Sequence, residues 1–178
     1  MPKPILVLDF DGVITNLDVD WNLVYNKVSD LTGYQIRGLI PFWEKYFGTE
    51  LFRLCNKIIE DYELKAISRC RPFEDVKPAF EEFEGTIYVA SMQSQKALEE
   101  FFVTNGLRQH LKEILGRDDF GSKPRQIRYI MSKEKDHRDI VLVDDMQENV
   151  DVCGRLNIRT ILFDRMRGDN LYELVKRL

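Results

Sequence analysis

Short, continuous runs of apolar residues, rich in β-branched side chains, recur at four places along the chain of 178 residues. Such runs are typical of strands that are buried on both faces of a parallel sheet. The pattern predicts strands over residues 5–9, 86–90, 139–144 and 160–163.

Amphipathic segments with helical spacing lie between these runs. Apolar residues repeat three or four positions apart over 75–83, 94–105, 124–133 and 149–156, and a further helix is expected over 171–178. Strands that alternate with helices of this length indicate parallel βαβ units, so the predicted fold class is α/β. Ligands of such sheets bind beyond the carboxyl ends of the strands, which places Asp9, Ser91 and Asp144 at one edge.

The segment 17–71 carries no strand signal. Its pattern predicts helices over 21–31, 41–47 and 50–67. The inner face of the last helix is expected to carry Leu51, Leu54, Ile58 and Ile59. We therefore expect an α/β core domain made of residues 1–16 and 72–178, with a small helical domain, 17–71, inserted after the first strand. The aromatic residues of this insertion should form its own small core or a dimer contact, and a substrate-facing role is the alternative: Phe42, Trp43, Tyr46 and Phe47.

Composition narrows the classes of partner and the expected location. The net charge of −4 and the interspersed charges argue against nucleic-acid binding. The three cysteines lack the spacing of a metal site, and their odd number, with no leader segment, predicts a cytoplasmic location. No apolar run has the length of a membrane span. We expect a small-molecule substrate, no membrane partner, and a monomer or homodimer.

The first strand ends in the most informative local sequence. Asp9 and Asp11 lie on the same side of an extended chain, and their carboxylates crowd unless a cation lies between them. Gly12 allows the backbone to turn sharply and to approach a ligand closely. These features favour a site for Mg²⁺ and phosphate, although aspartates also begin ordinary turns at strand ends.

Three further loops carry groups that complete a pattern. Ser91 follows the second predicted strand, Lys123 precedes a helix, and Asp144 and Asp145 follow the third strand. An acidic pair, a hydroxyl, a lysine and a second acidic pair, in that order, resemble the four motifs of the haloacid dehalogenase-like superfamily. The resemblance covers essentially the whole chain. It implies a Rossmann-like three-layer core with a central parallel sheet and a small helical cap, of the C1 type, inserted after the first strand.

The resemblance also implies a role for each matching residue. Asp9 corresponds to the nucleophile that forms an aspartyl-phosphate, Asp11 to the general acid and base, and Lys123 to the catalytic cation that steadies the phosphate and the nucleophile. The groups implied to bind the substrate phosphate are Gly12, Ser91, Met92 and Lys123, and those implied to hold Mg²⁺ are Asp9, Asp11, Asp144 and Asp145. Asp145 matches the direct metal ligand best and Asp144 would support it, although the two could exchange roles.

Some positions depart from the family pattern. Motif two has Ser91 in place of threonine, and Met92 stands where asparagine is frequent. Asn149 stands where a second acid often lies, so we expect Lys123 to lose a charge partner. Arg37 could meet an anionic substrate, with a solvated arginine as the alternative.

The expected activity is that of a Mg²⁺-dependent phosphohydrolase for a small phosphorylated metabolite, such as phosphoglycolate, a sugar phosphate or a nucleotide. A phosphomutase with the same nucleophile and a catalytically idle binding module are the alternatives. The crowded pair Asp9 and Asp11 argues against the idle module, because two close carboxylates are costly without a function.

Overall fold

The protein is described here by a computed structural model that covers residues 3–36, 38–134 and 139–178. Five parallel strands form one sheet in the order β3-β2-β1-β4-β5. The strands are β1 (Ile5–Leu8), β2 (Thr86–Ala90), β3 (Glu113–Leu115), β4 (Ile140–Asp144) and β5 (Arg159–Leu162). The four predicted strands are confirmed, and β3 was missed because a run of only three residues, one of them charged, carries no strand signal.

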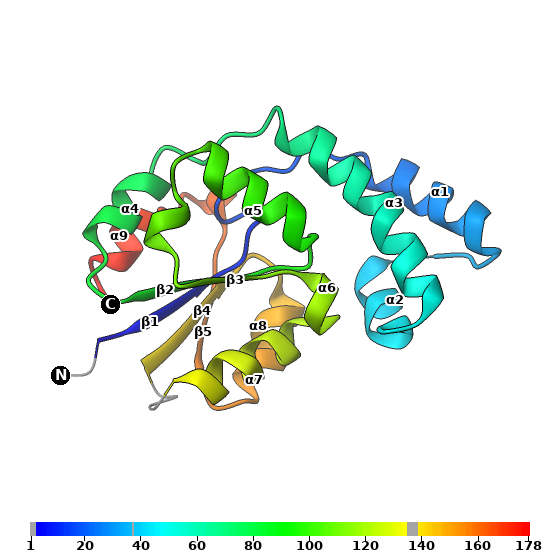
Figure 1. The fold of residues 1–178 in the computed structure, drawn as a ribbon. Helices are drawn as coiled ribbons and strands as arrows, with labels where there is room; N and C mark the ends of the chain where they lie inside the picture. Colours follow the sequence, from blue (N-terminus) through cyan, green and yellow to red (C-terminus); the bar gives the residue numbers. More distant parts are fainter. Residues whose placement is uncertain (1–2, 37, 135–138) are drawn as a thin grey trace.

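Helices cover both faces of the sheet, which gives three layers (Figure 1). The side chains of β1 alternate: Leu6 and Leu8 pack on one face against α4, α5 and α9, whereas Ile5 and Val7 pack on the other against α7 and α8. The bounds of the core helices are α4 (Val76–Glu82), α5 (Gln95–Thr104), α6 (Arg117–Phe120), α7 (Lys123–Lys133), α8 (Gln147–Gly154) and α9 (Leu171–Val175). Short 3₁₀ turns, η1 (Arg108–His110) and η3 (Arg165–Arg167), complete the connections.

Three helices lie between β1 and α4 in the chain, and we refer to them together as the three-helix segment: α1 (Trp21–Thr32), α2 (Leu39–Tyr46) and α3 (Glu50–Ile67). Figure 1 shows them beside the core, beyond one end of the sheet. They share a hydrophobic cluster in which Phe42 and Trp43 are buried, as expected for the aromatic residues. On α3 the predicted inward position of Ile59 is confirmed, whereas that of Leu54 was wrong, because Leu54 is 50% exposed and Cys55 is buried instead.

Local sequence explains where these helices begin and end. The side chain of Asp20 accepts a hydrogen bond from the amide of Leu23 at the start of α1, and Thr49 accepts one from the amide of Phe52 at the start of α3. Gly33 ends α1 with a φ of 69°, a left-handed conformation that glycine adopts without strain.

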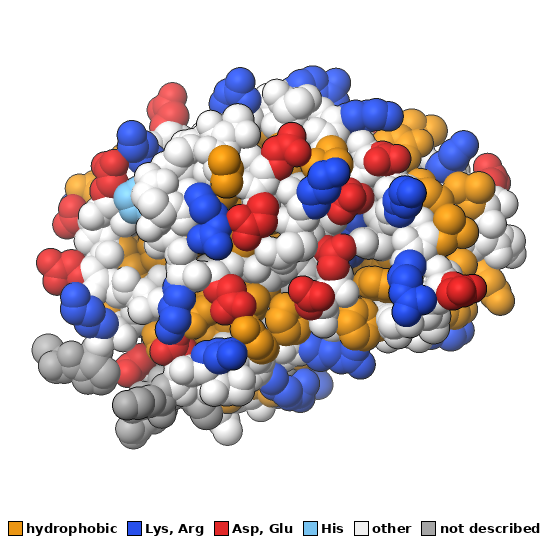
Figure 2. All heavy atoms as spheres, viewed as in Figure 1, with side chains coloured by type: hydrophobic (Ala, Val, Ile, Leu, Met, Phe, Trp, Pro, Cys, Tyr) orange, Lys and Arg blue, Asp and Glu red, His pale blue; other side chains and the backbone are white. Residues whose placement is uncertain are grey.

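Charged side chains of both signs are interspersed on the face drawn in Figure 2. Within the described part of the chain, no helix combines the length and the apolar character that a membrane span requires.

Candidate active site

The register of the sheet brings the sequence motifs together at one edge. Leu8 of β1 pairs with Val89 of β2 and with Val143 of β4. The residues that follow Val89 and Val143, which are Ala90 and Asp144, are therefore level with Asp9. The amide of Asp9 donates a hydrogen bond to the carbonyl of Val143 at 2.9 Å. Parallel strands thus place Asp9 and Asp144 side by side without any contribution from the loops.

Lys123 joins three strand ends. Its Nζ lies 2.5 Å from Oδ1 of Asp9 and 3.1 Å from Oδ2 of Asp144, and it also donates a hydrogen bond to the carbonyl of Ala90. Burial by itself lowers the pKa of Lys123, but the carboxylates of Asp144 and Asp9 raise it above its usual value. The lysine is therefore a fixed cation beneath the two aspartates.

Asn149 is not a charge partner of Lys123, as expected, but the lysine still has one in the same motif. Asp144 takes the place of the missing acid by pairing with the lysine. The amide nitrogen of Asn149 donates to both carboxylate oxygens of Asp144 at 3.0 and 3.1 Å, and the backbone amide of Met146 donates to Oδ1 at 2.9 Å. Asn149 thus orients the aspartate that faces the lysine.

The chain turns sharply after Asp9. The amides of Ile14 and Thr15 donate to the carbonyl of Phe10, and Gly12 has a φ of +81°. Asp11 stays beside this turn, where its Oδ1 accepts a hydrogen bond from the amide of Leu17 at 2.7 Å. Burial raises the pKa of the Asp11 carboxyl, against the effect of that hydrogen bond. A carboxyl group with a raised pKa can hold a proton for transfer.

Gly12 is required by space as well as by its φ value. A Cβ at this position would lie 2.6 Å from Cγ of Asp145, whereas a Cβ at Gly168, which has a φ of +91°, would meet no atom within 4 Å. We expect Gly12→Ala to lower the free energy of unfolding by about 1–2 kcal/mol for the left-handed backbone, and by a further amount for the displaced carboxylate.

Gly168→Ala is the matched control, because it carries the backbone strain without the contact. Urea denaturation of both variants measures the difference. An equal loss of stability in the two variants would contradict a role for the contact with Asp145.

Three carboxylates could hold a metal ion. Oxygen atoms of Asp9, Asp144 and Asp145 lie within 4.8 Å of one another. Burial, together with the nearby carboxylates of Asp144 and Asp11, raises the pKa of the Asp145 carboxyl to about 6. The pKa of Asp9 is raised as well, chiefly by burial, although Lys123 opposes the rise. An all-oxygen donor set whose charges repel suits a hard divalent cation.

Ser91 lies where the sequence placed it, directly after β2. It is fully buried, and its hydroxyl donates a hydrogen bond to Oε1 of Gln93. Ser94 caps α5 by accepting a hydrogen bond from the amide of Ala97.

A cavity of about 440 Å³ opens between these aspartates and the three-helix segment. Asp9, Asp11 and Asp145 line its floor, and Met146 and Glu148 line one side. Its volume lies in the range of small-molecule sites, roughly 300–1,000 Å³. Arg37, for which contact with an anionic substrate was one expectation, lies outside the described residues.

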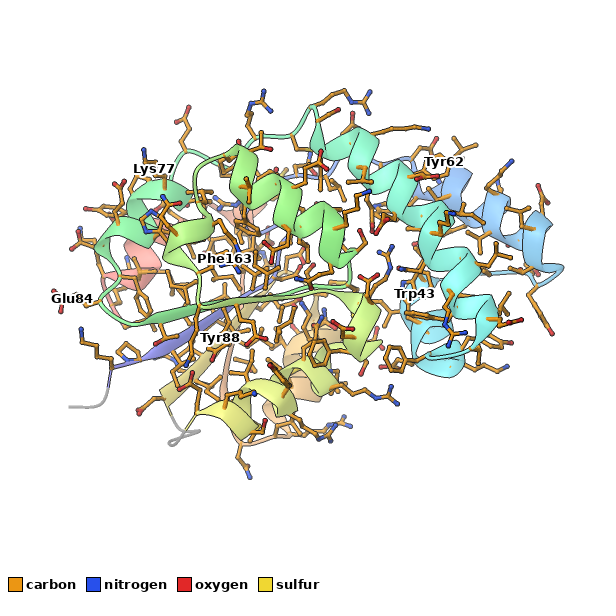
Figure 3. All side chains as sticks on the ribbon, in the orientation of Figure 1. Trp43, Tyr62, Lys77, Glu84, Tyr88 and Phe163 are labelled. Atoms are coloured by element: carbon orange, nitrogen blue, oxygen red, sulfur yellow. The ribbon has the colours of Figure 1, made fainter. Side chains whose placement is uncertain are left out.

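A buried polar network, missed from the sequence, closes the cavity at the junction of α3 and α6. Arg117 Nη1 lies 2.5 Å from Oε1 of Glu63, and the two side chains are 1% and 0% exposed. Arg117 also donates to Oδ1 of Asn56 and to the carbonyl of Met92, at 2.5 and 3.0 Å. Its guanidinium lies 4.9 Å from the ring centre of Trp43, which Figure 3 labels in the three-helix segment. This network holds the three-helix segment against the core.

The model of the family described as haloacid dehalogenase-like hydrolase matches residues 6–163. The match spans the strand ends, the lysine and the aspartates described above. The chain belongs to this family.

Solved structures agree on the fold. A predicted phosphatase from Clostridium acetobutylicum has a TM-score of 0.72 at 15% identity, and the alignment covers 99% of this chain and 98% of that one. A predicted phosphoglycolate phosphatase from Haemophilus somnus has a TM-score of 0.68 at 14% identity, with the same coverage. A hydrolase of the superfamily from Geobacter sulfurreducens has a TM-score of 0.64 at 10% identity, over 99% and 96% of the chains. The comparison with curated protein sequences found no match.

Proposed function

We propose that the protein is a Mg²⁺-dependent phosphohydrolase for a small phosphorylated metabolite. The observation that carries this proposal is the convergence of Asp9, Lys123 and Asp144 beneath one cavity. A carboxylate beside a fixed cation is arranged to attack phosphorus, whereas ordinary strand ends have no need of three crowded carboxylates.

The chemistry has two steps. An oxygen of Asp9 forms a bond to phosphorus while the bond from phosphorus to the alcohol oxygen breaks, and Asp11 donates a proton to that oxygen. Asp11 then accepts a proton from a water molecule whose oxygen attacks the aspartyl-phosphate, which releases inorganic phosphate and restores Asp9. Lys123 and the backbone amides near Gly12, Ser91 and Met92 hold the phosphate oxygens.

The three clustered carboxylates fit a bound Mg²⁺, with Asp9 and Asp145 as direct ligands, the backbone carbonyl of Asp11 as a third, and Asp144 in support. When bound, the ion offsets the repulsion between the Asp9 carboxylate and the phosphate. Asp144 suits a supporting role because Lys123 and Asn149 already occupy its oxygens.

We further propose that residues 17–71 act as a cap domain over a core made of 1–16 and 72–178. The observation in support is that α1, α2 and α3 share a hydrophobic cluster of their own and supply one wall of the cavity. A cap in this place would limit access of water and select the leaving group.

Phosphate release tests the proposed activity. Purified protein is incubated with p-nitrophenyl phosphate and a panel of metabolite phosphates, with Mg²⁺ or with EDTA. We expect release that requires Mg²⁺ and resumes when excess Mg²⁺ is added back. Transfer of the phosphoryl group within a substrate, without net release, would favour the phosphomutase. Failure of folded protein to turn over any ester would favour the idle binding module.

Metal binding should also stabilise the protein in a pH-dependent way. The raised pKa of Asp145, about 6 against an ordinary 3.8, means that this group favours the folded state at low pH and ceases to do so as the pH rises from about 4 to about 6. Above about pH 6, a bound cation offsets the repulsion between the ionised Asp145 and the neighbouring carboxylates. At concentrations near one hundred times Kd, Mg²⁺ should raise Tm by about 5–10 °C at pH 7.5, and by much less at pH 5.

The Asp145→Asn variant is the control for that measurement, since it lacks the titrating group. It should show a smaller shift at pH 7.5. An equal shift in wild type and variant, or a larger shift at pH 5, would contradict the assignment of Asp145 to the metal.

A further inference from the structure

The wall of the cavity that faces the aspartates is apolar. It is built by residues of the three-helix segment that are mostly half-buried: Trp21, Tyr25, Leu39, Ile40 and Pro41. The rings of Trp21 and Tyr25 are one helical turn apart on α1, with centres 6.5 Å from each other. Ile40 lines the cavity but takes no part in the hydrophobic cluster of the segment, so its side chain is available to a ligand.

The cavity offers little to a second negative charge on the substrate. Among the described residues that line it, Arg117 is the one cation, and its charge is already balanced by Glu63 at 2.5 Å. Its remaining donors go to Asn56 and to the carbonyl of Met92. Glu148, exposed on α8, adds a negative charge to the side of the cavity.

From this arrangement we infer that the substrate is a phosphate monoester whose leaving group is uncharged and has a flat, apolar body. This inference rests on the proposed phosphatase activity and concerns the part of the substrate beyond the phosphate. Trp21 and Tyr25 line the cavity, and aromatic rings favour contact with a planar group. A carboxylate or a second phosphate in the same place would lose its hydration and face Glu148, with no free cation among the lining residues that the structure describes.

The inferred substrate differs from the one for which some solved structures of the same fold are named. The predicted phosphoglycolate phosphatase from Haemophilus somnus is named for a substrate that carries a carboxylate next to its phosphate ester. For the present protein we expect such a compound to be a poor substrate, because no described lining residue offers it a free positive charge.

Two esters of nearly equal shape test the inference. The carbamoyl and carboxylate groups of 4-carbamoylphenyl phosphate and 4-carboxyphenyl phosphate are similar in size and differ in charge. We expect kcat/KM of wild type with Mg²⁺ at pH 7.5 to be at least about tenfold higher for the carbamoyl ester. Phosphoglycolate, measured in parallel, should rank with the charged ester.

A cation placed on the apolar wall should reverse part of this preference. The Ile40→Lys variant adds a positive charge where the leaving group is expected to lie, and the ratio of the two kcat/KM values should narrow by at least about threefold. Leu54→Lys adds the same charge at a site that is 50% exposed and does not line the cavity, so it should leave the ratio unchanged. Because each variant is compared on both esters, the difference in leaving-group acidity between the esters cancels.

The outcomes distinguish this inference from the proposed function. Hydrolysis of both esters with equal efficiency, or a preference for the charged one, would overturn the inference and leave the phosphatase activity standing. Hydrolysis of neither ester, nor of p-nitrophenyl phosphate, would overturn the proposed function itself. An unchanged ratio in folded Ile40→Lys would overturn the placement of the leaving group against this wall.

Discussion

Replacing Asp9 by asparagine should abolish turnover while the fold is retained. An amide cannot attack phosphorus to form the acyl phosphate, so kcat for phosphate release should fall by a factor on the order of 10³ or more. The substitution preserves the shape of the side chain, and Lys123 keeps its ion pair with Asp144 at 3.1 Å and its bond to the carbonyl of Ala90. Burial raises the pKa of the Asp9 carboxyl, so its ionised form is not a source of stability, and Tm should not fall.

Asp18→Asn is the matched control, because it makes the same change at an exposed aspartate outside the cavity. Acid-quenched wild type incubated with labelled substrate should carry a phosphoryl group that hydroxylamine removes, and Asp9→Asn should carry none. Retention of turnover by Asp9→Asn above about a tenth of wild type would exclude Asp9 as the nucleophile.

The arrangement of the motifs could be predicted from the sequence because parallel pairing brings the carboxyl ends of the strands to the same edge of the sheet. Asp9 and Asp144 directly follow or end buried apolar runs, and the register of β1 with β4 brings them level. Lys123 was placed by the order of the motifs alone, and its contacts with both aspartates follow from its position as the first residue of α7. Local sequence patterns were therefore sufficient to predict the central residues of the site.

The cavity wall opposite the aspartates could not be predicted in the same way. Glu63 and Arg117 are 54 positions apart, and their contact depends on how α3 packs against α6. One signal was present: Glu63 follows Ile59 by four residues, so a charged side chain lies on the buried face of an amphipathic helix. A buried charge is rare without a partner of opposite charge, but the sequence does not show which cation pairs with Glu63.

Removing one partner of that buried pair is expected to be among the most destabilising single substitutions in the molecule. Arg117→Met would remove the guanidinium and leave the carboxylate of Glu63 buried with one hydrogen bond, from the amide of Ser94 at 3.1 Å. Removing one partner of a buried pair typically costs about 3–5 kcal/mol. Arg108→Met is the matched control, because Arg108 and Glu99 form a pair at 2.8 Å whose side chains are each 37% exposed. That pair should contribute less than about 1 kcal/mol.

The double variant Arg117→Met, Glu63→Leu shows whether the cost comes from the stranded charge. Replacing both partners by apolar residues removes the unpaired carboxylate, so the double variant should be more stable than Arg117→Met alone.

The pH dependence of stability gives an independent test of the same charge. Burial already raises the pKa of Glu63 while Arg117 opposes the rise, so loss of the arginine should raise it further. A carboxyl with a raised folded-state pKa stabilises the protein less as the pH increases. The free energy of unfolding that Arg117→Met loses relative to wild type should therefore be smaller at pH 5 than at pH 8. Urea denaturation at both pH values measures these differences. A deficit that is the same at the two pH values, or a double variant no more stable than Arg117→Met, would mean that Glu63 does not carry the buried charge in the folded protein.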